Sequence, residues 1–106
     1  MITIDAKILR SWQIDQRYFI LVDTLPLSAY EKGHLPGAIS IASDDIIELA
    51  PLRLPDKDTV IVVYCASKEC KRAGLAAERL EVLGYTRITY FSDGKKGWVT
   101  AGYLLE

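Results

Sequence analysis

The sequence contains few of the side chains that bind metal ions or form disulfide frameworks. Its 106 residues include one histidine, one methionine and two cysteines. Two cysteines are too few for the disulfide framework of a small secreted domain. One histidine without a second ligand cluster offers no metal site, and the chain has neither a G-x-G-x-x-G motif nor a P-loop for a nucleotide. We therefore expect no metal, nucleotide or organic cofactor.

An excess of one charge is also missing, since 13 basic residues nearly balance 14 acidic ones and the formal net charge is -1. A chain without a global field does not attract nucleic acid or an anionic membrane surface. The N-terminal stretch "MITIDAKILRSWQID" has acids at Asp5 and Asp15 and no uninterrupted apolar block, which excludes a signal peptide or a transmembrane helix there. We expect a cytoplasmic protein that binds neither nucleic acid nor a membrane.

What the chain does contain suits one domain. Half of the residues are hydrophobic and a quarter are charged, which is enough to bury a core at this length. We expect residues 1–106 to form a single domain. Because the cytoplasm is reducing, its two thiols are expected to be reactive rather than structural.

Short apolar runs alternate with helical patterns along the chain. Strands are expected at 2–4, 18–23, 59–64 and 86–91. Helices are expected after an Asp5 cap, at 26–33, at 44–50 behind a Ser43 cap, from about Cys70 to Gly84, and at 93–102, with an extended segment at 34–42 and a loop at 51–58. This alternation predicts an α/β fold with parallel strands and right-handed crossovers.

Both cysteines lie in one stretch, "VIVVYCASKECKRAG", in which the most apolar strand ends at Cys65. Ligands of open parallel sheets bind beyond the carboxyl ends of the strands, so the loop after this strand is expected to form the site. Its backbone N–H groups can surround an anion, and the start of the next helix adds partial positive charge. We expect the pKa of Cys65 to lie below its usual value, with Lys68 and Lys71 helping and Glu69 opposing. The alternative is that Cys65 is a small buried hydrophobic residue.

Two longer stretches carry a resemblance to a known family. "YFILVDTLPLSAYEKGHLPGAISIA" resembles the first half of rhodanese-like domains, where a strand ending in L-V-D precedes a short helix and G-H-[IL]-P-G-A. The sequence from 60 to 106 is similar to their second half, with a cysteine after a strand, a loop, a helix containing A-A-x-x-L, then G-Y and G-W. The match covers about residues 4–106. It implies a five-stranded, mainly parallel sheet flanked by helices on both faces.

The resemblance also implies a sulfurtransferase that works through a persulfide on Cys65. The Cys65 thiolate takes the outer sulfur of a small anionic donor, thiosulfate or a persulfide, and passes it to a thiol, cyanide or a protein cysteine. The loop that follows is expected to bind the substrate, with backbone N–H groups stabilising the negative charge. The predicted substrate-binding residues are Ala66, Ser67, Lys68, Glu69, Cys70 and Lys71, and the predicted supporting residues are Asp23, His34 and Arg72.

The loop departs from the family pattern at two positions. Members often carry a glycine near the middle of the loop and an arginine five residues after the cysteine, where this chain has Lys68 and Cys70. Without the arginine the loop lacks a bidentate anion fork, which puts specificity for thiosulfate in question. Cys70 can resolve a persulfide or sulfenic acid by forming a disulfide with Cys65, or it can be packed as a neutral residue at the helix start.

The supporting residues have structural alternatives as well. Asp23 can orient the loop or cap a turn, and His34, the only histidine, is expected to fix a turn rather than act as a general base. Arg72 and Arg79 lie at helical spacing and are expected on a solvated face.

Three classes of function therefore remain open. The leading one is a sulfurtransferase, and the second is a noncatalytic or redox-regulatory module that uses Cys65 and Cys70. The third is a phosphatase or arsenate reductase, which needs an arginine about six residues after the cysteine. Here Lys71 holds that position and the arginine follows one residue later.

Overall fold

The computed structural model describes residues 1–106 and contains one parallel sheet of five strands. The strand order is β1-β5-β4-β2-β3, and every pair of neighbours is parallel. The strands are β1 (Ile2–Ile4), β2 (Ile20–Asp23), β3 (Ile39–Ser40), β4 (Ile61–Tyr64) and β5 (Ile88–Phe91). The expected parallel sheet is confirmed, and the short β3 forms one edge of it.

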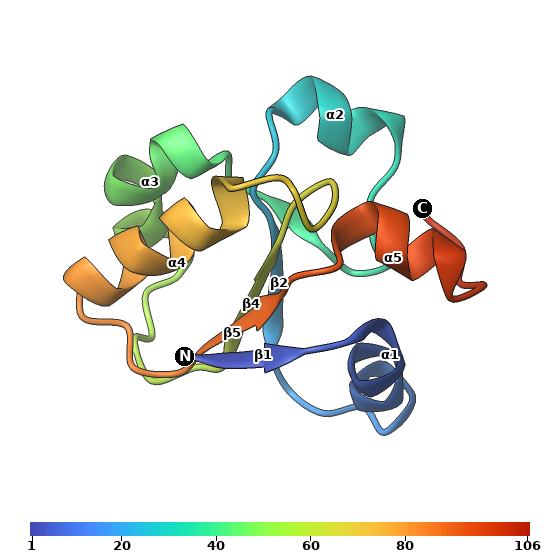
Figure 1. The fold of residues 1–106 in the computed structure, drawn as a ribbon. Coiled ribbons are helices and arrows are strands. Elements are labelled where there is room, and N and C mark those ends of the chain that lie inside the picture. Colours follow the sequence, from blue (N-terminus) through green and yellow to red (C-terminus); the bar gives the residue numbers. More distant parts are fainter.

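Helices cover both faces of the sheet, as Figure 1 shows. They are α1 (Ala6–Ile14), α2 (Leu27–Lys32), the 3-10 turn η1 (Ser43–Asp45), α3 (Ile46–Arg53), α4 (Arg72–Val82) and α5 (Gly94–Thr100). α3 and α4 pack on one face, while α1 and α5 pack on the other. None of these helices is both long enough and apolar enough to cross a bilayer.

β4 lies in the middle of the sheet because it has no polar face to leave in water. All four of its residues are buried. Ile61 and Val63 pack on the α3 and α4 side, and Val62 and Tyr64 pack on the α1 and α5 side. This burial on both faces matches the continuous apolar run of the sequence. Because β4 lies between β5 and β2, its carboxyl end is at the centre of the edge of the sheet where the strands end.

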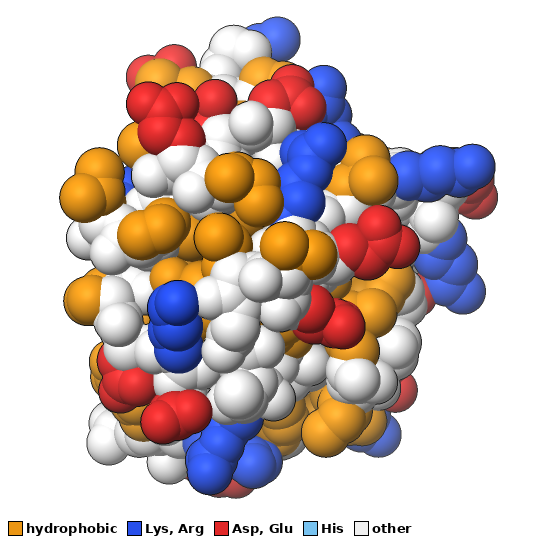
Figure 2. Space-filling view, turned by 90° about the vertical axis from the view of Figure 1, so that its left-hand side faces the viewer, with side chains coloured by type: hydrophobic (Ala, Val, Ile, Leu, Met, Phe, Trp, Pro, Cys, Tyr) orange, Lys and Arg blue, Asp and Glu red, His pale blue; other side chains and the backbone are white.

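The face formed by α3 and α4 mixes hydrophobic and charged side chains on its surface (Figure 2). The large hydrophobic residues exposed on these two helices are Ile47, Leu52, Leu75 and Val82.

The expected loop at 51–58 is wrong in its first three residues, because α3 continues through Pro51 to Arg53. A proline inside a helix removes one backbone donor. Here burial of Ala50 and Leu54 outweighs that loss, and the Tyr85 hydroxyl donates to Ala50 O at 3.0 Å. The helix is held by the core rather than by its propensity.

The observed helix ends agree in part with the expected caps. Asp5 caps α1, since its Oδ1 accepts from Ile8 N at 2.8 Å, and Gly84 follows α4 with a φ of +96°. Ser43 does not cap α3 with its side chain. It begins the turn η1 instead, and its hydroxyl accepts from Arg72. α4 begins at Arg72, so Cys70 lies in the loop before the helix.

Candidate active site

The loop after β4, residues 65–71, is attached to the first turn of α5. Lys95 N donates to Cys65 O at 3.0 Å, and Lys96 N donates to Ala66 O at 2.9 Å. Within the loop, Cys70 N donates to Ser67 O at 3.2 Å. These bonds fix the start of the loop and close a turn between its two cysteines.

Gly94 permits this close approach between α5 and the loop. Its φ of +65° is in the left-handed region that favours glycine. A Cβ at this position would lie 2.5 Å from Cys65 O and 2.8 Å from Ser67 N, which are backbone atoms. The glycine in "SDGKKGW" is therefore part of the site. Sequence reasoning missed it, although an Asp-Gly pair is a usual turn signal.

The Cys65 thiol is enclosed. Its residue is 1% exposed, and the thiol donates to Cys70 O with an Sγ···O distance of 3.3 Å. Burial, followed by the neighbouring Cys70 thiol, raises the pKa of Cys65 to about 11, although N–H groups of Ala73 and Ala66 favour the thiolate. The expectation of a lowered pKa at Cys65 is therefore wrong for this conformation.

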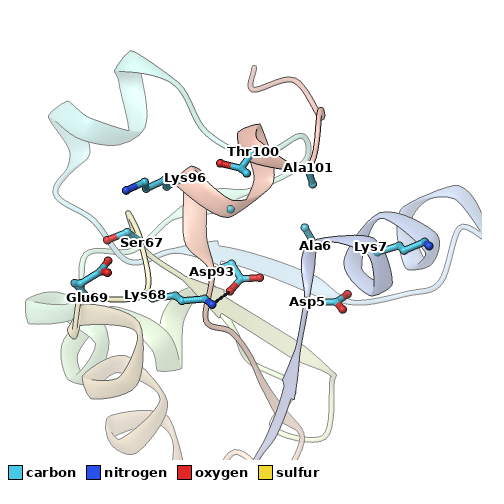
Figure 3. Close-up of a pocket in the computed structure, with 11 residues that line it drawn as sticks. Asp5, Ala6, Lys7, Ser67, Lys68, Glu69, Asp93, Lys96, Thr100 and Ala101 are labelled. Atoms are coloured by element: carbon cyan, nitrogen blue, oxygen red, sulfur yellow. Dashed lines mark ion pairs between the residues drawn. The ribbon is translucent and has the colours of Figure 1, made fainter.

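The reason is that the loop does not direct its cations toward Cys65. Lys68 is 74% exposed and pairs with Asp93 at an Nζ···Oδ1 distance of 3.6 Å, on the outer side of the loop (Figure 3). Lys71 is exposed and precedes α4. Of the predicted backbone donors only Ala66 acts on Cys65, while Ala73 acts from the first turn of α4. The N–H groups of Ala66 and Ala73 alone do not offset the effect of burial on the pKa of Cys65.

Cys70 has the opposite tendency. It is partly buried against the core that contains Cys65. Burial disfavours its thiolate, but hydrogen bonds from the Cys65 thiol and from Ala66 N and Arg72 N, with the charge of Arg72, leave the pKa of Cys70 lowered. Each thiol thus affects the ionisation of the other, and the thiolate is favoured at Cys70 and disfavoured at Cys65.

Asp23 lies at the centre of a buried network beside the loop. Its Oδ2 accepts from the Tyr64 hydroxyl at 2.9 Å, and its Oδ1 accepts from Leu25 N at 2.9 Å. Tyr64 in turn accepts from Leu35 N at 3.0 Å. Burial, followed by the charge of Asp23, raises the pKa of Tyr64, so Tyr64 stays a donor. Of the two roles considered, Asp23 caps the turn at Leu25 directly.

Asp23 also reaches the loop, through Lys95. The Lys95 ammonium lies 3.7 Å from Asp23 Oδ2 and donates to Ala29 O at 2.8 Å. The backbone N–H of the same lysine donates to Cys65 O. A buried carboxylate, a mostly buried lysine and the first residue of the loop are therefore linked. Sequence reasoning missed Lys95 and Tyr64, because nothing local marks their partners.

His34 has a structural position, as expected. Its Nδ1 lies 3.0 Å from Tyr30 O, and its ring stacks on Tyr30 with centroids 3.9 Å apart. Its backbone pairs with Glu106, with His34 N donating at 3.1 Å and His34 O accepting at 2.7 Å. None of these bonds involves the 65–71 loop.

Arg72 and Arg79 are only partly solvated, which corrects the expectation of a solvated face. Arg72 Nη1 donates to Ser43 Oγ at 3.1 Å, and Arg79 donates to Ser43 O. Both guanidinium groups lie within 4 Å of Asp44, at 3.7 and 3.9 Å. They connect α4 to η1, and the Arg72 guanidinium donates to η1 rather than to the loop.

The outer side of the loop borders a cleft of about 480 Å³ between the start of α1 and α5 (Figure 3). Ser67, Lys68 and Glu69 line it from the loop, and Lys96 and Asp93 line it from α5 and the residue before it. Acids and bases are mixed there. The pKa of Glu69 is lowered, first by a hydrogen bond from its own backbone N–H and then by one from the Ser67 hydroxyl.

No group of three or more His, Cys, Asp or Glu side chains in the structure is arranged to hold a metal ion.

The chain is similar to known proteins in both sequence and fold. A family model described as "Rhodanese-like domain" matches residues 5–101. The chain belongs to the rhodanese-like family. This confirms the family and the fold inferred from the sequence motifs.

Two curated relatives match part of the chain. Thiosulfate sulfurtransferase PspE from Escherichia coli is 31% identical over 67 residues, which are 63% of this chain and 62% of that protein. The HTH-type transcriptional regulator Rv0324 from Mycobacterium tuberculosis is 31% identical over 86 residues, 81% of this chain and 37% of that protein. The chain thus matches less than two thirds of the length of either relative.

Solved structures are similar over nearly the whole rhodanese-like chain. The BH2092 protein of Bacillus halodurans has a TM-score of 0.91 at 30% identity, covering 99% of this chain and 76% of its own. The rhodanese-like domain of the Anabaena protein Alr3790 has a TM-score of 0.89 at 26% identity, covering 100% of this chain and 79% of its own. These likenesses support the fold throughout.

Proposed function

We propose that this rhodanese-like domain is a sulfurtransferase that carries sulfur as a persulfide on Cys65. The observation that carries the proposal is the position of Cys65, directly after the central strand β4 and inside a loop closed by hydrogen bonds to α5. The similarity to a thiosulfate sulfurtransferase supports the chemistry. Because the reaction needs a reduced thiol, a cytoplasmic location belongs to the proposal.

The mechanism begins with ionisation of the thiol pair. The Cys65 thiol donates its proton to Cys70 O, and the neighbouring Cys70 sulfur, whose thiolate is favoured, can accept that proton when Cys65 ionises. The Cys65 thiolate then attacks the outer sulfur of thiosulfate or of a persulfide, and sulfite or a thiolate leaves. N–H groups of Ala66 and Ala73 stabilise the charge on the persulfide. Cyanide, a small thiol or a protein cysteine accepts the sulfur.

Incubation with thiosulfate tests this proposal. One added sulfur, about 32 Da, is expected on Cys65 by peptide mass spectrometry, or sulfite is released in an amount equal to the protein. The Cys65→Ser variant should show neither. If the intact chain neither gains sulfur nor releases sulfite with thiosulfate or a small persulfide, the proposal fails.

A regulatory module is the second candidate. It is favoured by the enclosed Cys65 thiol and by the match to a protein named as a transcriptional regulator. In that case the Cys65 and Cys70 pair reports oxidation without catalysing transfer. A phosphatase has less support, because the Arg72 guanidinium donates to Ser43 and pairs with Asp44, both on η1, rather than bonding within the loop.

A further inference from the structure

Two thiols share the 65–71 loop, and the persulfide chemistry transfers sulfur through only one of them. The Cys65 sulfur lies 3.3 Å from Cys70 O. Standard backbone dimensions place a carbonyl oxygen about 2.4 Å from its own Cα, so the Cys65 sulfur lies within roughly 6 Å of the Cys70 Cα. Cys70 also packs against the hydrophobic cluster that contains Cys65. Because the S–S bond of a disulfide is about 2.05 Å long, closing it requires the Cys70 side chain to turn toward Cys65 and the loop to adjust around it.

The two cysteines also differ in accessibility. Cys65 is 1% exposed, whereas Cys70 is partly exposed at the rim of the loop. An outside acceptor must approach sulfur held on a buried residue, while the Cys70 thiol is already beside it. A reductant, by contrast, can approach the sulfur of Cys70 from solvent.

We propose that Cys70 is the resolving thiol of this site and that a dithiol reductant is the co-substrate. The proposal rests on the proposed function, since it starts from the Cys65 persulfide. The Cys70 sulfur attacks Cys65 Sγ and forms an S–S bond. The bond between Cys65 Sγ and the transferred sulfur breaks, and that sulfur leaves as hydrosulfide with the proton of Cys70. The transferred sulfur is thereby reduced, and the two cysteines are oxidised to a disulfide.

The dithiol then reduces the Cys65–Cys70 disulfide by two successive thiol exchanges and becomes a cyclic disulfide itself. Over the whole cycle, thiosulfate and one dithiol give sulfite, hydrosulfide, one proton and the oxidised dithiol. The further activity is thus a dithiol-dependent reduction of sulfane sulfur.

The surroundings of Cys70 suit a resolving nucleophile. Exchange rates rise with the thiolate fraction of the attacking thiol. The charge of Arg72 and the N–H groups of Ala66 and Arg72 favour the thiolate of Cys70. Arg72 is itself held by Ser43 and Asp44, so it stays beside the loop.

A single turnover without any added thiol separates the two half-reactions. The full chain is mixed with thiosulfate, and sulfite, hydrosulfide and protein mass are measured until they stop changing. Wild type should release both sulfite and hydrosulfide and lose two hydrogens, about 2 Da, as the disulfide closes. Dithiothreitol, a small dithiol, should then restore the original mass. Cys70→Ser and Cys70→Ala should release about tenfold less hydrosulfide or none, because the resolving sulfur is gone.

The controls make each failure distinct. Cys65→Ser should release neither sulfite nor hydrosulfide. Sulfite without hydrosulfide from wild type, with the persulfide retained, overturns the resolving role of Cys70 and leaves the sulfurtransferase standing. Absence of sulfite from wild type overturns the proposed function itself. Because both decisions come from wild type, they hold even if a variant folds poorly.

Discussion

The inner and outer sides of the 65–71 loop are built from opposite kinds of side chain. On the inner side, Cys65 and Cys70 face the core with hydrogen bonds from backbone groups. On the outer side, Lys68 and Glu69 border an open cleft, and Lys68 pairs with Asp93, the residue before α5. The comparison shows that a cation near a cysteine in sequence need not act on it. Which side of the loop a side chain occupies decides whether it acidifies the thiol.

The largest effect on the free energy of unfolding is expected at Gly94, where α5 contacts the backbone of the loop. Gly94→Ala adds a Cβ that would lie 2.5 Å from Cys65 O, at a positive φ. Overpacking and a left-handed conformation together predict a loss of about 3 kcal/mol or more in the free energy of unfolding. Gly37→Ala is the matched control, with a φ of +82° and open space around the new Cβ. Urea denaturation measures both, and equal losses would show that the contact with the loop is unimportant.

Removing a buried charge should lower the free energy of unfolding more than removing an exposed one. Asp23→Asn breaks the pair with Lys95, which is 15% exposed, and should lower the free energy of unfolding by about 3 kcal/mol. Asp93→Asn breaks the exposed pair with Lys68 and should cost less than about 1 kcal/mol. Thermal and urea unfolding of both variants provide the comparison. Similar losses would contradict the buried network described for Asp23.

The two thiols should differ in reactivity near neutral pH. With the pKa of Cys65 at about 11 and that of Cys70 lowered, iodoacetamide should alkylate Cys70 first, by about tenfold or more in rate. Raising the pH toward 11 should increase the thiolate of Cys65 and reduce the difference. Peptide mass spectrometry over time measures each site, with the urea-unfolded chain as control. Preferential alkylation of Cys65 at neutral pH would show that the thiolate resides there instead.

The raised pKa of Cys65 also has a consequence for stability. A thiol whose pKa is higher in the folded than in the unfolded chain stabilises the fold below its unfolded pKa, 9.0, and this contribution is lost as the pH rises to about 11. The lowered pKa of Cys70 acts in the opposite direction. Cys65→Ser should therefore reduce the alkaline loss of stability, as measured by the urea midpoint across this pH window.

The smallest effect is expected on the outer side. Lys68→Gln removes an exposed cation whose only ion pair is with Asp93, so the alkylation rate of Cys70 should change by less than about threefold. Arg72→Gln is the contrasting variant, because the charge of Arg72 favours the Cys70 thiolate and its loss should slow alkylation more. A larger effect of Lys68 than of Arg72 would reverse the assignment of inner and outer sides.

Much of the fold could be predicted because its determinants are local. The apolar run of β4, the Asp5 cap of α1 and the glycine after α4 are each read within a few residues. The position of the loop at the end of β4 follows from topology in the same way. Pro51 shows the limit, because a local rule that ends a helix was overruled by burial of the residues around it.

The sequence by itself determined the family, the parallel sheet and the placement of two cysteines in one loop at the end of the central strand. Only the tertiary structure decided how acidic each cysteine is. The pKa of a thiol depends on burial and on the direction of every nearby donor and charge, and those come from α4 and α5 as well as from the loop. Contacts between residues far apart in the sequence, such as Lys95 and Asp23, leave no periodic or local pattern in a chain.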